Sequence, residues 1–180
     1  MTAARVVVGD ITRLGEQGVA ADAIVNAANE RLAAGSGVCG AIFAAAGHRD
    51  LSEACARLGS CPTGTAVATP AFALERRGVR HVIHAVGPVH AAHPPEESDR
   101  LLASAYRSVL EVAEEIGASI VAVPAISTGI YGFPERRAAA IAVREVLDHR
   151  GDLDEVVLVA FDPATAAVLQ EALDEAGGPG

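Results

Sequence analysis

Short apolar runs alternate along the chain with segments in which apolar residues recur every three or four positions. The runs are rich in valine and isoleucine and predict six β-strands: Arg5–Val8, Ala23–Asn26, Thr65–Thr69, His81–Val86, Ser119–Val123 and Glu155–Phe161. Several of them have no alternating polar face, which is typical of strands that are buried on both sides. We therefore expect a central sheet that is covered by helices.

The segments with helical spacing lie between and after these runs. They predict helices over Val38–Ala46, Asp50–Leu58, Asp99–Ile116, Glu135–His149 and Pro163–Ala176. Strands that alternate with helices are typical of the α/β class, and 180 residues suit one domain, which we expect over residues 1–176. Residues 177–180 are expected to form a frayed tail, and Val89–Ser98, with its prolines and histidines, a flexible loop.

Two glycine-containing loops follow predicted strands and lead toward predicted helices. One is Gly35-Ser36-Gly37-Val38-Cys39-Gly40, and the other is Ser127-Thr128-Gly129-Ile130-Tyr131-Gly132. Glycine lets the backbone approach a ligand closely and exposes consecutive N–H groups, and the N-terminus of a helix favours an anion. Two such loops together predict a clamp for a diphosphate.

Polar side chains stand where two of the early strands end. Asp10 follows the first strand and has two interpretations, a carboxylate that accepts the exocyclic amine of adenine or the N-cap of a short helical turn. Asn26 and Asn29 enclose two alanines just before the first glycine loop. Their amides predict ligand contacts there, although a pair of turn-forming asparagines is the alternative.

Charge and cysteine content narrow the classes of partner. The 23 acidic and 14 basic residues give a net charge of -9, which disfavours nonspecific binding to nucleic acid. All basic residues are arginine, so no lysine nucleophile is available.

Three cysteines form no CxxC pair, and no apolar run is long enough to cross a membrane or form a signal peptide, so a reducing cytoplasm is expected. The histidines His90 and His93 match no strong zinc pattern, and we predict no metal and no cofactor.

At this point the chain resembles the macrodomain family, and within it the MacroD-type branch of bacterial and other members. The matching stretches occur in the order of the family: Gly9–Thr12, Ile24–Asn29, Gly35–Gly40, Cys61–Gly64, Val82–Pro88 and Pro124–Pro134. They cover nearly the whole chain, and six motifs in order are far more specific than any one of them.

The resemblance implies a three-layer α/β/α fold with a central mixed, mostly parallel sheet of about six strands, which binds ADP-ribose at the strand ends. It places adenine near Asp10 and Ile11, and the distal ribose near Asn29 and Tyr131. Backbone groups of the two glycine loops surround the diphosphate. Phe161 is a candidate for stacking on adenine, with a core aromatic as the alternative. The implied partners are ADP-ribose and mono-ADP-ribosylated macromolecules, either protein or nucleic acid.

One departure from the family bears on catalysis. Hydrolytic MacroD-type members usually carry an aspartate where this chain has Cys39, and often a histidine where it has Phe43. We expect hydrolysis of mono-ADP-ribosyl linkages by water that the substrate phosphate and Asn29 position. The alternatives are a reader that binds without chemistry, a deacylase of O-acyl-ADP-ribose, and an interaction module without affinity for ADP-ribose.

Cys39 itself has two interpretations. A thiol near a helix N-terminus can be a nucleophile, which makes Cys39 a weaker catalytic candidate than Asn29. The alternative is a small residue that is tolerated where the carboxylate was lost.

Overall fold

The computed structural model describes residues 2–177. Six strands form one sheet: β1 (Ala3–Val8), β2 (Ala23–Ala27), β3 (Ala66–Pro70), β4 (His81–Ala85), β5 (Ile120–Pro124) and β6 (Glu155–Ala160). The α-helices are α1 (Gly37–Ala46), α2 (His48–Leu58), α3 (Pro95–Glu115), α4 (Glu135–Asp148) and α5 (Pro163–Gly177). Three short 3-10 helices are η1 (Ile11–Gln17), η2 (Phe72–Arg77) and η3 (His90–Ala92).

The sheet is mixed and mostly parallel, with the strand order β1-β6-β5-β2-β4-β3. Every neighbouring pair is parallel except β3 and β4, which run antiparallel at one edge. The carboxyl ends of the parallel strands therefore meet at one edge of the sheet, which is where ligands bind in open α/β sheets.

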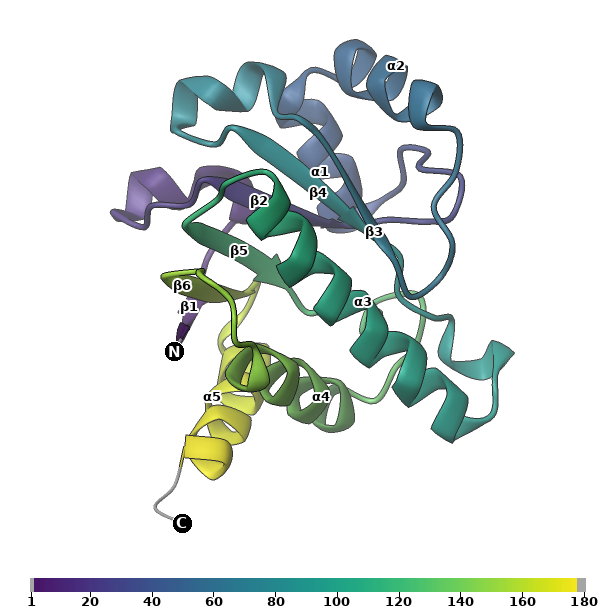
Figure 1. Cartoon of the computed structure of the whole chain (residues 1–180), viewed down its shortest axis with the longest axis vertical. Helices are drawn as coiled ribbons and strands as arrows, with labels where there is room; N and C mark the ends of the chain where they lie inside the picture. Colours follow the sequence, from purple (N-terminus) through teal and green to yellow (C-terminus); the bar gives the residue numbers. More distant parts are fainter. Residues whose placement is uncertain (1, 178–180) are drawn as a thin grey trace.

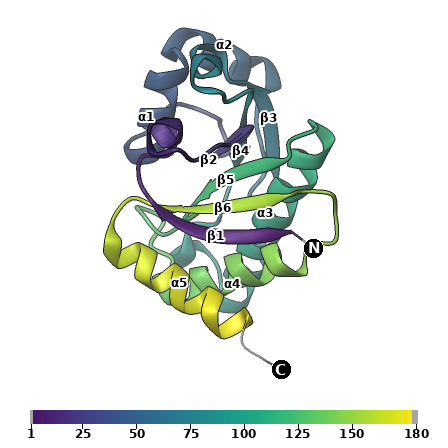
Figure 2. The ribbon, with the colours of Figure 1, turned by 90° about the vertical axis from the view of Figure 1, so that its left-hand side faces the viewer.

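Two apolar cores lie on opposite faces of this sheet, which gives the three layers of Figures 1 and 2. Successive side chains of β6 point to opposite faces of the sheet. Val156 and Leu158 pack with α3, α4 and α5, whereas Val157 and Val159 pack on the other face with α1 and α2. In Figure 2, α4 and α5 lie together beyond β1, and α1 and α2 lie on the opposite side. The three-layer α/β/α fold is confirmed.

The predicted strands and helices are all present, with ends that differ by a few residues. The prediction of a flexible loop over Val89–Ser98 is wrong, because η3 occupies His90–Ala92 and α3 already begins at Pro95. Proline lacks an N–H and has a fixed φ, so it suits the first position of a helix.

Gly177, which the sequence placed in a frayed tail, ends α5, and the rest of that tail lies outside the described residues. No helix within residues 2–177 has the length and apolar character that a membrane span requires.

Candidate functional site

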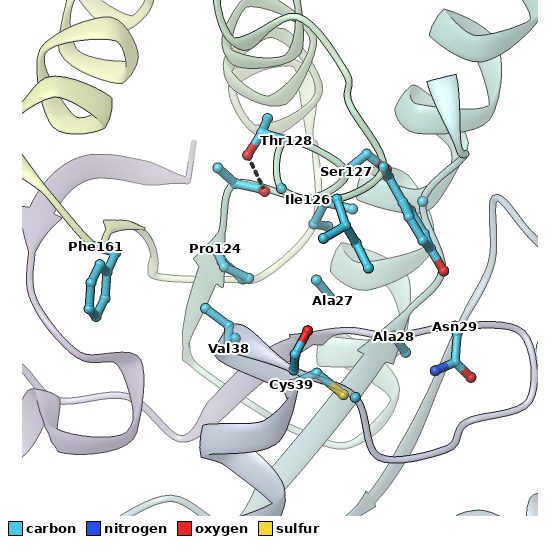
Figure 3. Close-up of a pocket in the computed structure, with 18 of the residues that line it drawn as sticks. Ala27, Ala28, Asn29, Val38, Cys39, Pro124, Ile126, Ser127, Thr128 and Phe161 are labelled. Carbon is cyan, nitrogen blue, oxygen red and sulfur yellow. Dashed lines mark hydrogen bonds between the residues drawn. The ribbon is translucent and has the colours of Figure 1, made fainter. Parts of the chain in front are cut away.

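A cavity of about 330 Å³ opens at the carboxyl ends of β2, β5 and β6. Its lining includes most of each glycine loop, one on each side (Figure 3). The lining residues are Ala27–Asn29, Gly35–Cys39, Gly87, Pro124–Tyr131, Val159, Phe161 and Thr165. The fold thus brings together two loops that are about 90 residues apart in the chain.

The first wall is the N-terminal turn of α1. Ser36 is the N-cap, and its side chain makes no capping hydrogen bond, so the first N–H groups of this ten-residue helix have no side-chain acceptor. Gly37 adopts φ +60°, a left-handed conformation that favours glycine. Gly40 lies just inside the helix, and a Cβ there would stand 2.7 Å from the carbonyl oxygen of Gly35. The close approach of loop and helix therefore needs a glycine at position 40.

The second wall is the turn after β5. The N–H of Phe133 donates to the Ser127 carbonyl at 2.9 Å, and the Thr128 hydroxyl donates to the Ala125 carbonyl at 2.9 Å (Figure 3). Ser127 has φ +67°, and its buried hydroxyl has no partner among the described residues. A Cβ at Gly87 would overlap with that hydroxyl, so the lack of a side chain at position 87 lets the turn pack against the end of β4.

Asn29 and Phe161 mark opposite ends of the cavity (Figure 3). The Asn29 amide makes two hydrogen bonds with Ala33: Nδ2 donates to the carbonyl at 3.0 Å, and Oδ1 accepts the N–H at 3.1 Å. Phe161 is 79% exposed, so the alternative of a core aromatic is wrong. A flat apolar ring in solvent beside a cavity can stack on a base.

Four predicted ligand contacts do not line the cavity: Asp10, Ile11, Asn26 and Gly40. Asp10 is the N-cap of η1, where its Oδ1 accepts the Thr12 N–H at 2.9 Å. Ile11 is a core residue with 5% exposure. The capping interpretation of Asp10 is therefore confirmed, whereas its contact with adenine stays a prediction.

Asn26 is buried beneath the site, where its Nδ2 donates to His84 Nδ1 at 3.0 Å. His84 Nε2 lies 3.0 Å from the Thr69 hydroxyl and 3.8 Å from Cys55 Sγ. Burial lowers the pKa of His84 to about 4, so this ring is neutral near pH 7. Asn26 and the buried Ile24 are two residues apart in β2, so their side chains lie on the same face of the strand. That spacing was the sequence signal for a buried side chain at Asn26.

Cys39 lines the cavity, but its thiol is mostly buried and points to the Ala33 carbonyl, with Sγ to O 3.9 Å. Phe43 does not line it and packs in the core against His48 and His84. No aspartate, glutamate, histidine or arginine occurs among the lining residues, whose only ionisable side chains are Cys39 and Tyr131. Burial raises the pKa of the Tyr131 phenol, and the negative charge of Glu30 adds to the rise. The cavity therefore offers polar backbone rather than charge.

Sequence reasoning did not assign a ligand role to Gly87, Val159 and Thr165. Gly87 and Val159 stand at or just after the carboxyl ends of β4 and β6, so strand position alone was a usable signal. Thr165 lies in the first turn of α5 and carried no such signal. Within residues 2–177 there is no group of three His, Cys, Asp or Glu that could hold a metal ion.

Comparison with known proteins identifies the family of the chain. The family model of the Macro domain matches residues 25–142. A macro domain-containing protein of Ralstonia nicotianae is 47% identical, and the match covers 93% of this chain and 92% of the relative. A Salmonella gallinarum protein named O-acetyl-ADP-ribose deacetylase is 45% identical, with coverage of 96% and 95%.

Solved structures show the same fold. The Oceanobacillus iheyensis macrodomain with ADP is 36% identical and superposes with a TM-score of 0.86 over 96% of this chain and 90% of that one. The Trypanosoma brucei macrodomain in complex with ADP-ribose is 33% identical, with a TM-score of 0.80 over 94% of this chain and 68% of that one. With the family model matching more than half of its residues, and relatives of this similarity along nearly its whole length, the chain belongs to the macro domain family.

Proposed function

We propose that this protein binds ADP-ribose and hydrolyses mono-ADP-ribosyl linkages on macromolecules. One observation carries the proposal: a single cavity runs from the exposed ring of Phe161 to the amide of Asn29, between two turns rich in backbone N–H groups. Adenine stacks on Phe161, the diphosphate lies between the turns, and the distal ribose reaches Asn29. We expect this macrodomain to extend over residues 1–176, as a single unit in the cytoplasm.

The relatives support the ligand. Structures of macrodomains with ADP and with ADP-ribose superpose on nearly all of this chain. Backbone N–H groups at the start of a helix bind phosphate oxygens without cationic side chains, which suits a cavity lined by no arginine. Such a site holds one nucleotide and does not require the basic surface that binds nucleic acid backbones.

The chemistry follows from the absence of a side-chain base in the lining. Water attacks the anomeric carbon of the distal ribose, the bond from that carbon to the modified side chain breaks, and the side chain leaves with the electron pair of that bond. A diphosphate oxygen of the substrate accepts the proton of the water, while Asn29 holds the ribose. The rate then comes from proximity and a preorganised site rather than from general-base catalysis by the protein.

A second candidate is the deacylation of O-acyl-ADP-ribose. It is favoured by the name of the Salmonella gallinarum relative and by the same cavity. An acyl ester on the distal ribose would place its carbonyl near Asn29 and Tyr131.

Calorimetry and two hydrolysis assays test these functions. We expect ADP-ribose to bind with a stoichiometry of one, and Asn29→Ala to bind it more weakly. A mono-ADP-ribosylated protein and O-acetyl-ADP-ribose are then offered separately, and the released ADP-ribose is measured. If the protein binds ADP-ribose but releases none from either substrate, it is a reader of ADP-ribose. If it does not bind ADP-ribose, it is an interaction module.

A further inference from the structure

The segment Cys61–Gly64 belongs to the motifs noted in the sequence, yet none of its residues lines the cavity. It lies instead against the turn that carries Asn29. The Cys61 N–H donates to the Glu30 carbonyl at 2.9 Å. The Glu30 carboxylate accepts two hydrogen bonds from Thr63, one from the N–H at 3.2 Å and one from the hydroxyl at 2.7 Å.

The Asn29 turn is closed on itself as well. Besides the two hydrogen bonds between Asn29 and Ala33, the Leu32 N–H donates to the Asn29 carbonyl at 2.9 Å. Leu32 is 2% exposed and adopts φ +55°. The turn is therefore closed by its own hydrogen bonds, and the contacts of Glu30 with Cys61 and Thr63 join its outside to the rest of the fold.

The outer contacts lead back to rigid elements of the fold. The Gly64 N–H donates to the Val86 carbonyl at 2.7 Å, and the Ser104 hydroxyl of α3 donates to the Gly64 carbonyl at 2.7 Å. On the other side of Asn29, the Ala28 N–H donates to the Ala85 carbonyl of β4 at 2.9 Å. These hydrogen bonds, together with the covalent links from Gly64 to Thr63 and from Glu30 to Asn29, thus connect α3 and the end of β4 to Asn29.

We propose that Glu30 and Thr63 are positioning residues for the distal end of the cavity, where they fix Asn29 against the second ribose of the ligand. This inference rests on the proposed binding of ADP-ribose. Neither side chain touches the ligand, and each acts through the turn of Asn29. Displacements of about 1 Å at such a contact are costly in an enzyme site.

The state of Glu30 agrees with this role. The hydrogen bonds from Thr63 lower the pKa of the Glu30 carboxyl, so it is ionised near pH 7 and accepts strongly. Its charge also contributes to the raised pKa of Tyr131, which belongs to the second glycine loop and lines the cavity. The ionised carboxylate strengthens the two hydrogen bonds that hold the Asn29 turn against Thr63.

The test compares ADP-ribose with ADP, which lacks the distal ribose. Calorimetry is run on the wild type, Thr63→Val, Thr63→Ser, Glu30→Ala and Glu30→Gln. We expect Thr63→Val and Glu30→Ala to weaken ADP-ribose binding about threefold to tenfold and to leave ADP binding within about twofold. Thr63→Ser and Glu30→Gln keep a donor and an acceptor, so they should recover most of the affinity.

Glu53→Ala is the matched control, because Glu53 also pairs with another side chain, Arg49, but lies on the exposed side of α2. Unchanged ADP-ribose affinity in Thr63→Val and Glu30→Ala would overturn the inference. An equal loss for both nucleotides would overturn it too, since it would indicate a general loss of structure. Failure of the wild type to bind either nucleotide would instead refute the proposed function.

Discussion

At the scale of single residues, the proposed hydrolysis makes Cys39 the position at which a general base can be added. Its thiol points to the Ala33 carbonyl, and no acidic side chain lines the cavity. We expect Cys39→Asp to raise the hydrolysis rate about 10²-fold by adding a general base near the distal ribose. Cys39→Ala should keep the rate of the wild type. A large loss of activity in Cys39→Ala would instead identify the thiol as a nucleophile.

A substitution of Phe161 should change ADP-ribose binding without changing the stability of the fold. Because its ring is 79% exposed, Phe161→Ala should change the free energy of unfolding by less than about 0.5 kcal/mol. Loss of a stacked base should still weaken ADP-ribose binding about fivefold or more. Leu58→Ala, at a remote residue that is 45% exposed, is the control for both measurements. Equal affinity in Phe161→Ala and the wild type would remove Phe161 from the adenine site.

At the scale of elements, the approach of the first glycine loop to α1 depends on Gly40. Alanine normally stabilises a helix relative to glycine, but a Cβ at position 40 would stand 2.7 Å from a backbone oxygen of Gly35. Gly40→Ala should therefore displace the loop and weaken ADP-ribose binding by about tenfold. Gly15→Ala is the control, because its nearest neighbour lies at an ordinary 3.5 Å. Calorimetry on both variants would contradict the prediction if their affinities were equal.

The buried group of β2, β3, β4 and α2 around His84 gives the fold a pH dependence. The pKa of His84 is lowered from 6.5 to about 4 in the folded state, so the unfolded chain binds the proton more readily. The contribution of the neutral ring to the free energy of unfolding is present above pH 6.5 and is lost as the pH falls toward 4. Between pH 7.5 and 4.5 the wild type should lose about 2 to 3 kcal/mol from this group.

Urea unfolding at both pH values measures that loss. His84→Gln has no titrating ring, so its stability should fall less over the same range, whatever its stability at pH 7.5. A loss in His84→Gln as large as that of the wild type would show that other groups cause the pH dependence.

The sheet, the five helices and both glycine loops could be predicted because each depends on local patterns, such as valine-rich runs and glycines after strands. The position of Asn26 in β2 was a signal for a buried side chain, but its hydrogen bond to His84 on the neighbouring strand has no local pattern in the sequence. The start of α3 at Pro95 was missed because proline is common both in loops and in the first turn of a helix, and the sequence alone does not distinguish the two. Contacts between distant segments, such as Glu30 with Thr63, leave no local pattern.

At the scale of the whole molecule, the net charge of -9 and the uncharged cavity predict an unusual salt dependence. A site built on arginine would lose affinity for an anionic nucleotide as salt rises. Here the acidic protein repels the ligand weakly, and salt screens that repulsion. ADP-ribose affinity should therefore stay constant or rise by about twofold between 50 and 300 mM NaCl. A steep fall in calorimetric affinity would indicate that a cationic side chain reaches the diphosphate.

The proposed binding of the nucleotide by main-chain N–H groups also bears on how such a protein can evolve. Every residue except proline supplies the same N–H, so side chains in the two turns are free to drift where the backbone shape is kept. Recognition of the nucleotide and the reaction performed on it can then diverge separately. An acidic residue and a cysteine could then exchange at position 39 without loss of the ligand, and the same scaffold could pass between catalysis and sensing by a single substitution.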